Sequence, residues 1–209
     1  MVDEEPSGLR ERKKHQTRKA LSDAALDLIF ERGVENVRRE DIAARVGVST
    51  RTFNNYFAGK YEALAYRQVE RMLRSVALLL ARPADEPLWA AVTAAILEPF
   101  AADGDQNVAP SRAQLAELRK LLAVPEIQAA MSKEVFGFDG ELAAAIARRT
   151  GTDLTKDLYP RLVVAAIGAA WLAATDLYLC ADPPVPIVGL LRKAFSEIAA
   201  GLPDPSAKN

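Results

Sequence analysis

Three side chains within five positions of this sequence can form paired hydrogen bonds with the edges of DNA bases. Arg51 can bridge the O6 and N7 atoms of guanine, and Asn54 and Asn55 can each bridge the N6 and N7 atoms of adenine. Each good pair of this kind contributes about 1–3 kcal/mol of discrimination between bases. Because the three residues are spaced three and four positions apart, they would share one face of a helix. The spacing therefore predicts a short helix that reads DNA sequence.

A helix-turn-helix pattern surrounds these residues. The segment Asp41–Lys60 reads DIAARVGVSTRTFNNYFAGK, in which Gly47 permits a tight left-handed turn and Ser49 is a suitable N-cap for the second helix. Phe53 and Phe57, with the valines before them, supply the apolar wedge that such a motif buries. A short polar helix can also be merely solvated, and for the Gly-Val-Ser turn taken alone the two interpretations carry similar weight.

The charge of the chain is unevenly distributed. The net charge of −1, taken alone, argues against a nucleic-acid-binding protein. Between Leu9 and Lys60, however, 12 basic residues stand against 7 acidic ones, whereas from Tyr61 to Asn209 15 basic residues stand against 18 acidic ones. A basic N-terminal module followed by a mildly acidic remainder is expected when only the first part touches phosphates.

The single cysteine and the apolar segments bear on location. Cys180 has no partner for an intramolecular disulfide and cannot form a cysteine-based metal site, and a small buried hydrophobe is its simplest interpretation. The N-terminus is charged where a secretory signal would be apolar. The most apolar stretch, Leu162–Cys180, is interrupted by Asp176 and is interpreted as a buried helix, with a membrane span as the less favoured alternative. We expect a cytoplasmic protein with no membrane partner.

Apolar periodicity, caps and breakers predict an all-α protein of about nine helices. An N-terminal helix-turn-helix domain of three helices is expected over residues 9–60, and a C-terminal helical bundle domain for ligand binding and dimerisation over residues 61–202. Pro99 should kink or shorten its helix, and Gly137 and Gly140 should distort theirs. The predicted helices are Leu9–Arg32, Arg39–Val46, Thr50–Tyr56, Lys60–Ala81, Leu88–Ala102, Ser111–Ala123, Pro125–Thr150, Asp157–Ala181 and Ile187–Ala200.

From about Lys13 to Leu64 the chain resembles the DNA-binding domain of TetR-family transcriptional regulators. Residue type and spacing agree over roughly fifty positions, which is the first third of the chain. The remaining helices agree with the family in number and length only. The matching residues are Phe30, Gly33, Asp41-Ile42-Ala43, Gly47-Val48-Ser49, Thr52-Phe53, Tyr56-Phe57, Lys60, Glu62 and Leu64.

The resemblance implies a role for each matching position. The third helix of the family enters the major groove, and an aromatic residue at its end and the lysine that opens the fourth helix contact phosphates. The sequence departs from the family at Arg38, where a threonine usually caps the second helix, at Asn54, which is usually aromatic, and at Tyr61, which is often acidic. Arg38 could replace the phosphate contact of the threonine but not its cap. The implied DNA-facing residues are Thr50, Arg51, Thr52, Asn54 and Asn55, those near phosphates are Tyr56, Lys60 and Arg38, and the first helix adds Arg12, Lys13, Thr17 and Arg18.

The resemblance also implies two properties of the C-terminal domain. The eighth and ninth predicted helices would form a four-helix bundle with a second copy, giving a homodimer, although both could instead pack only within one protomer. A pocket among the middle helices would bind a small apolar or amphipathic effector, although aromatic residues at helical spacing are more often plain core. The candidate pocket residues are Trp89, Phe100, Met131, Phe136, Phe138 and Trp171.

No constellation of residues supports catalysis. The lone histidine, His15, lies among arginines and lysines, and the sequence has no metal-ligand spacing, phosphate-binding glycine loop or nucleophile motif. We therefore expect no enzyme, no cofactor and no metal. The leading hypothesis is a ligand-responsive regulator, a repressor or else an activator, that binds a palindromic double-stranded DNA operator as a dimer. A small-molecule-binding or scaffold protein with a vestigial DNA-binding module is the alternative, and an all-α enzyme ranks last.

Overall fold

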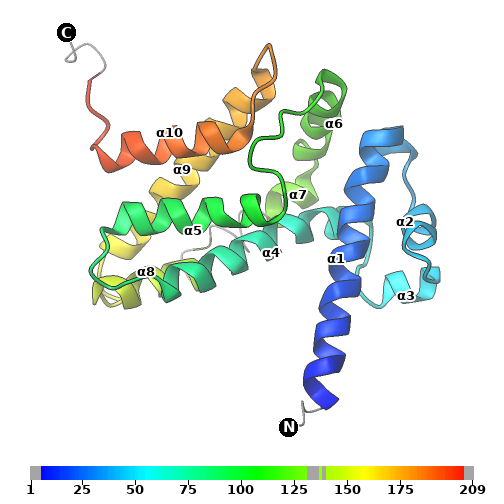
Figure 1. The fold of residues 1–209 in the computed structure, drawn as a ribbon, viewed down its shortest axis with the longest axis horizontal. Helices are drawn as coiled ribbons and strands as arrows, with labels where there is room; N and C mark the ends of the chain where they lie inside the picture. The colour runs from blue at the N-terminus through cyan, green and yellow to red at the C-terminus, as the bar shows by residue number, and fades with distance from the viewer. Residues whose placement is uncertain (1–5, 131–136, 138–139, 205–209) are drawn as a thin grey trace. The chain divides into compact units, whose positions relative to one another are not determined.

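The computed structural model describes residues 6–130, 137 and 140–204. These residues form ten α-helices and one 3₁₀ helix, and they contain no strand, which confirms the all-α class (Figure 1). The elements are α1 (Pro6–Arg32), η1 (Val34–Asn36), α2 (Arg39–Val46), α3 (Thr50–Asn54), α4 (Lys60–Ala81), α5 (Leu88–Ala102), α6 (Arg112–Leu122), α7 (Pro125–Ala130), α8 (Glu141–Thr150), α9 (Tyr159–Cys180) and α10 (Ile187–Ala199).

The chain divides into two compact units. The first comprises residues 1–68 and 117–130, and the second comprises residues 69–116 and 131–209. Two helices therefore contribute residues to both units, because α4 passes from one to the other after Gln68 and α6 does so before Glu117.

The first unit is built on the apolar stripe of α1. Leu21, Ala25, Leu28 and Ile29 are at most 1% exposed, as their spacing predicts. The guanidinium of Arg45 on α2 donates two hydrogen bonds, of 2.6 and 2.9 Å, to the Glu31 carboxylate at the end of α1. The hydrogen bonds from Arg45 hold the pKa of Glu31 below its usual range. Packing and this ion pair together fix α2 against α1.

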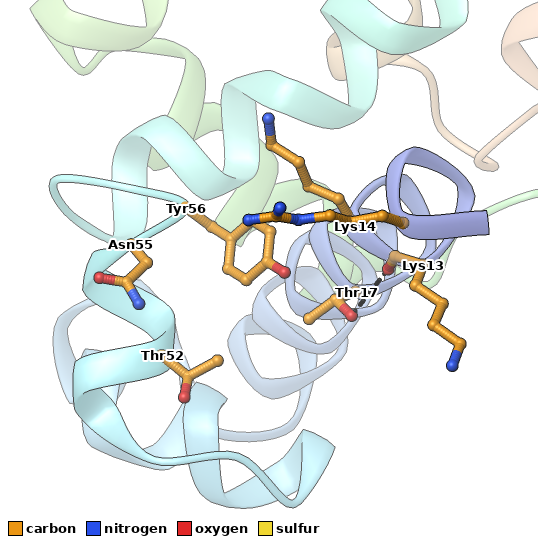
Figure 2. Close-up of a pocket in the computed structure, with 7 residues that line it drawn as sticks. Lys13, Lys14, Thr17, Thr52, Asn55 and Tyr56 are labelled. Carbon is orange, nitrogen blue, oxygen red and sulfur yellow. Dashed lines mark hydrogen bonds between the residues drawn. The ribbon is translucent and has the colours of Figure 1, made fainter. Parts of the chain in front are cut away.

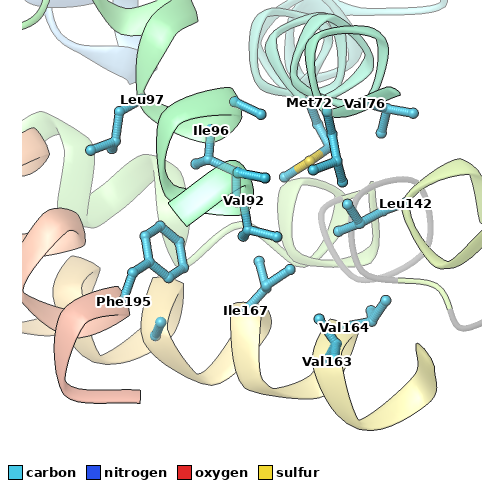
Figure 3. Packing of buried hydrophobic residues seen from close by; sticks show 14 of the residues in the cluster. Met72, Val76, Val92, Ile96, Leu97, Leu142, Val163, Val164, Ile167 and Phe195 are labelled. Atoms are coloured by element: carbon cyan, nitrogen blue, oxygen red, sulfur yellow. The ribbon is translucent and has the colours of Figure 1, made fainter. Parts of the chain in front are cut away.

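The second unit has an aliphatic core made by five helices. Side chains from α4, α5, α8, α9 and α10 point into a common interior, as Figure 3 shows for Met72, Val76, Val92, Ile96, Leu142, Val163, Val164, Ile167 and Phe195. Phe195 is fully buried, so one face of α10 belongs to the core of its own protomer. The guanidinium of Arg149 donates hydrogen bonds to the carbonyl oxygens of Arg82, Pro83 and Glu86, which holds the loop after α4.

Two expectations about the helices need correction. The predicted helix from Pro125 to Thr150 is two helices, because Gly140 adopts an extended conformation (φ −84°, ψ 176°) as the N-cap of α8. The first helix begins at Pro6, three residues before the predicted start. The helix that contains Pro99 has the predicted bounds, Leu88–Ala102.

The long apolar helix α9 is less buried than its sequence suggests. Leu162, Leu172 and Leu177 are 54%, 72% and 56% exposed, and Cys180 is exposed rather than buried. By length and composition α9 could cross a membrane, but a single such helix is weak evidence, because helices of water-soluble proteins meet the same criteria. An exposed apolar stripe of this kind marks an interaction surface.

Candidate nucleic-acid interface

A left-handed glycine joins the two helices of the motif. Gly47 ends α2 with φ 75° and ψ 28°, a conformation that costs a residue with a side chain about 1 kcal/mol or more. The next N–H group, of Val48, donates a hydrogen bond of 3.0 Å to the Ala43 carbonyl oxygen. Two residues later the Ser49 hydroxyl accepts a 3.0 Å hydrogen bond from the Thr52 N–H and caps α3. The predicted turn and cap are both confirmed.

Aromatic packing sets the orientation of α3. Phe53 and Phe57 are at most 1% exposed, and their ring centroids lie 5.8 Å apart. The rings of Phe57 and Tyr66, which is on α4, pack edge to face with their centroids 5.6 Å apart. With this face of α3 held inside the unit, the opposite face must point to solvent.

The outward face of α3 carries the residues expected to read bases. Arg51, Asn54 and Asn55 are exposed, whereas Thr50 and Thr52 are half-buried at the edge of the face. The Thr52 hydroxyl lies 2.9 Å from the Ser49 hydroxyl, so Thr52 also takes part in the cap. The structure thus brings one guanidinium and two carboxamides together on a single accessible surface.

A basic groove of about 620 Å³ runs beside this face, between α3 and the N-terminal half of α1. Figure 2 shows Thr52, Asn55 and Tyr56 on one side of it and Lys13, Lys14 and Thr17 on the other, with the Tyr56 ring directed toward α1. The Thr17 hydroxyl donates a 2.9 Å hydrogen bond to the Lys13 carbonyl oxygen. The lining carries three positive charges and no negative one, which suits an anionic backbone; its residues are Arg10, Lys13, Lys14, Thr17, Thr52, Asn55 and Tyr56.

Sequence reasoning did not place Arg10 and Lys14 among the DNA-binding residues, although both line the groove. The positions 10, 13, 14 and 17 repeat at the helical spacing of three and four, which is a signal that could have selected them. Arg12, which the resemblance brought in, is exposed but is not part of the lining.

Arg18 lies over aromatic rings inside the first unit. Its guanidinium carbon is 4.3 Å from the centroid of the Tyr66 ring and 5.2 Å from that of Phe57. The side chain is half-buried there. Through this cation–π contact α1 packs against Phe57 and Tyr66, the aromatic residues that follow the C-terminal end of α3.

Arg38 and Lys60 flank the helix-turn-helix: Arg38 directly precedes α2, and Lys60 is the first residue of α4. The Lys60 ammonium donates hydrogen bonds of 2.6 and 3.1 Å to the carbonyl oxygens of Val34 and Val37. The exposed Arg38 is the N-cap of α2, but its side chain makes no capping bond; its backbone N–H donates to the Asp41 carboxylate at 2.9 Å. As expected, Arg38 does not replace the capping role of a threonine.

The candidate pocket residues of the second unit belong to or border its core. Phe100 is 3% exposed, its ring centroid lies 6.1 Å from that of Trp171, and Trp89 and Trp171 are half-buried against the same cluster. The guanidinium of Arg71 lies 4.1 Å from the Phe100 ring centroid and is paired with the carboxylates of Asp103 and Asp105. The other candidates, Met131, Phe136 and Phe138, lie outside the described residues.

Within the described part of the chain no three histidine, cysteine or acidic side chains are grouped so that they could hold a metal ion. The features that the structure does show are a turn, an exposed polar helix and an adjoining basic groove. They define a helix-turn-helix protein that binds double-stranded DNA.

Comparison with known proteins identifies the family. One family model, described as bacterial regulatory proteins of the tetR family, matches residues 21–65, and a second, described as the MftR C-terminal domain, matches residues 86–203. The HTH-type transcriptional regulator TcmR of Streptomyces glaucescens is 33% identical over 179 residues, which cover 84% of this chain and 79% of TcmR. The chain therefore belongs to the TetR family of bacterial transcriptional regulators.

Further relatives agree with this assignment. The putative mycofactocin biosynthesis transcriptional regulator MftR of Mycobacterium tuberculosis is 28% identical over 91% of this chain and 93% of its own. Thermus thermophilus FadR, solved in complex with lauroyl-CoA, has the same fold with a TM-score of 0.56 at 17% identity, covering 92% of this chain and 98% of FadR. The family consists of DNA-binding regulators and not of enzymes. This confirms two predictions from the sequence, namely that the chain is a TetR-family regulator and that it is not an enzyme.

Proposed function

We propose that this protein is a ligand-responsive transcriptional repressor of the cytoplasm, which binds a palindromic operator as a homodimer and is released by a small-molecule inducer. Residues 9–60 would bind DNA, and residues 61–202 would bind the effector and form the dimer. The observation that carries the proposal is the exposed surface of Arg51, Asn54 and Asn55 on α3, beside a groove without negative charge. These three side chains would read the bases.

The phosphate contacts would surround the base-reading face. The groove is lined or bordered by Tyr56, Thr17, Lys13 and the half-buried threonines of α3. A sugar-phosphate strand lying in it would therefore meet hydroxyl and ammonium groups. An ammonium has three N–H donors, so Lys60 keeps one beyond its two carbonyl bonds for a phosphate at the N-terminus of α4. The proposed DNA-binding set is Lys13, Thr17, Arg38, Thr50, Arg51, Thr52, Asn54, Asn55, Tyr56 and Lys60, with Arg18 bracing it from within.

A second copy of this chain is the proposed occupant of the exposed stripe on α9. Leu162, Leu172 and Leu177 recur along one side of the helix with exposed alanines between them, so two such helices could pack closely. On α10, Leu191 and Phe195 are fully buried within the protomer, so Leu190 and Ile198, both half-buried, would supply its part of the interface. The family acts as dimers, and we propose a four-helix bundle from α9 and α10 of each protomer as the dimer interface. The two α3 helices of such a dimer would read two half-sites about 34–36 Å apart, which is one turn of DNA.

The proposed effector binds near the aromatic pair of the second unit. Phe100 and Trp171, with Trp89, offer apolar and aromatic surface, and the nearest buried cation, Arg71, is already neutralised by carboxylates. This environment favours the apolar part of an amphipathic molecule. FadR of Thermus thermophilus, which has the same fold, was solved in complex with lauroyl-CoA, an amphipathic molecule whose apolar part is an acyl chain. Binding would release DNA only if the effector prefers the conformation that fits the operator poorly.

The test is a fluorescence anisotropy titration with DNA from upstream of the gene for this protein, in parallel with a scrambled duplex. Arg51→Ala should weaken binding to the operator by about tenfold to a hundredfold and should change binding to the scrambled duplex little. Arg192→Ala, which removes another exposed arginine, on α10, is the matched control and should bind as the wild type does. Equal affinity of the wild type for both duplexes, or no effect of Arg51→Ala, would favour a scaffold protein with a vestigial DNA-binding module.

A further inference from the structure

The turn between α1 and α2 is held on both sides by side chains from distant parts of the sequence. Val34 and Val37, which flank this turn, are buried, and the ammonium of Lys60 binds both of their carbonyl oxygens. On the other side, the Glu117 carboxylate on α6 accepts a 2.7 Å hydrogen bond from the Val34 N–H. The peptide groups on both sides of Val34 are therefore each bound by a charged side chain.

The position of Glu117 is itself fixed. Its second carboxylate oxygen lies 2.6 Å from the Lys120 ammonium, and its side chain is only 16% exposed. The hydrogen bonds from Lys120 and from the Val34 N–H hold the pKa of Glu117 below its usual range. A Cβ atom added at Gly33 would lie 3.4 Å from the carboxylate oxygen that binds the Val34 N–H, which is ordinary contact, whereas the φ of 84° at Gly33 favours glycine. The carboxylate thus fits closely against the turn.

The turn that Glu117 holds lies at the opposite end of α1 from the groove. The groove is lined by α1 as far as Thr17, whereas the turn follows Arg32, the last residue of α1. Fifteen helical residues separate these two positions, which is roughly 20 Å at 1.5 Å per residue. Glu117 is therefore not among the residues that line the groove, and we attribute its effect on DNA binding to the position of the turn, which also holds Lys60 and precedes α2 and α3.

We propose that Glu117 is a positioning residue for DNA binding. By accepting the hydrogen bond of the Val34 N–H, it fixes the turn before α2 and so the orientation of α2 and α3. This inference rests on the proposed function and adds a residue that lies outside the DNA-binding segment 9–60. Helix α6 is continuous from Arg112, and its first residues belong to the second unit, where the effector would bind.

The test measures operator affinity, its salt dependence and the Val34 amide together. Glu117→Ala should weaken operator binding by about tenfold, while the slope of log Kd against log salt changes by less than one, because no phosphate contact is lost. Glu117→Gln keeps an oxygen that can accept the bond and should recover most of the affinity. In an amide NMR spectrum the Val34 proton should move upfield in Glu117→Ala and exchange faster with solvent.

A matched control separates position from charge. Glu126→Ala removes an exposed carboxylate from α7 of the same unit and should bind DNA as well as or slightly better than the wild type, because a negative charge is lost. If Glu117→Ala binds within twofold of the wild type, binds more tightly, or shows a salt slope reduced by one or more, the inference is wrong. If Glu117→Ala does not fold, Glu117→Asp, which is shorter by one methylene group, is subject to the same criteria. Failure of the wild type to prefer any operator would instead overturn the proposed function.

Discussion

Replacing Asp103 by Asn should destabilise the second unit strongly, because this carboxylate joins two arginines in its interior. Asp103 accepts hydrogen bonds of 2.8 and 3.1 Å from Arg71 and of 2.7 Å from Arg74. The side chains of Asp103 and Arg71 are each only 7% exposed. The substitution keeps the size of the side chain but removes its charge, so Arg71 would retain only Asp105 as a carboxylate partner.

The pKa of Asp103 gives the magnitude. Burial makes the largest single contribution and raises the pKa, but the hydrogen bonds and positive charges of Arg74 and Arg71 together outweigh it and lower the pKa from 3.8 to about 2. At 1.36 kcal/mol per unit, this shift corresponds to about 2.5 kcal/mol in favour of the folded carboxylate. Removing one partner of a buried ion pair costs about 3–5 kcal/mol. We therefore expect Asp103→Asn to lower the free energy of unfolding by about 2–4 kcal/mol.

Urea denaturation followed by tryptophan fluorescence measures this effect in the correct unit, because both tryptophans, Trp89 and Trp171, belong to the second unit. Protein concentration must be held constant, since a dimer is stabilised by association. Asp182→Asn is the control: its ion pair with Arg112 is 67–77% exposed, and its loss should cost at most about 1 kcal/mol.

Acidification provides a second check on the same ion pair. Because the pKa of Asp103 is lower in the folded state, the unfolded chain takes up the proton first as the pH falls. The stabilisation is therefore complete above about pH 5 and is lost as the pH falls from about 4 to 2. The difference between the wild type and Asp103→Asn should shrink over that range. A difference below 1 kcal/mol at pH 7, or one that grows in acid, would refute the reasoning.

Three further substitutions test the cap, the groove and the dimer. Ser49→Ala removes the N-cap of α3 and should lower the free energy of unfolding of the first unit by about 1 kcal/mol in circular dichroism melts; an unchanged melt would mean that the cap is dispensable. Lys14→Ala should reduce the salt slope of DNA binding by about 1 without changing the preferred sequence, and an unchanged slope would place Lys14 away from phosphate. Leu172→Glu should convert a dimer into a monomer in sedimentation velocity, whereas a persistent dimer would move the interface away from the α9 stripe.

Features set by neighbouring residues could be predicted from the sequence. The left-handed Gly47, the Ser49 cap and the buried stripe of α1 depend on interactions within a few positions, and all three are present. The same kind of signal predicted the exposure of Arg51 and Asn55, since Phe53 and Phe57 must face inward.

Features that depend on distant contacts could not be predicted in this way. The position of the Arg18 guanidinium over the ring of Tyr66, a residue of another helix, is one such contact. The hydrogen bond between Val34 and Glu117 joins positions 83 residues apart, and no periodicity points to it. The break before α8 depends on the extended conformation of Gly140, whereas a glycine within a helical pattern predicts only a distortion.

Selection from a random double-stranded DNA library tests the central claim most directly, because the library contains every possible half-site and no operator sequence has to be chosen. The purified protein is bound to the library at physiological salt, and the retained DNA is sequenced after successive rounds. The account predicts an inverted repeat whose half-sites are centred about one helical turn apart, with guanine at the positions that Arg51→Ala ceases to select. Retained DNA that remains random in sequence would contradict it.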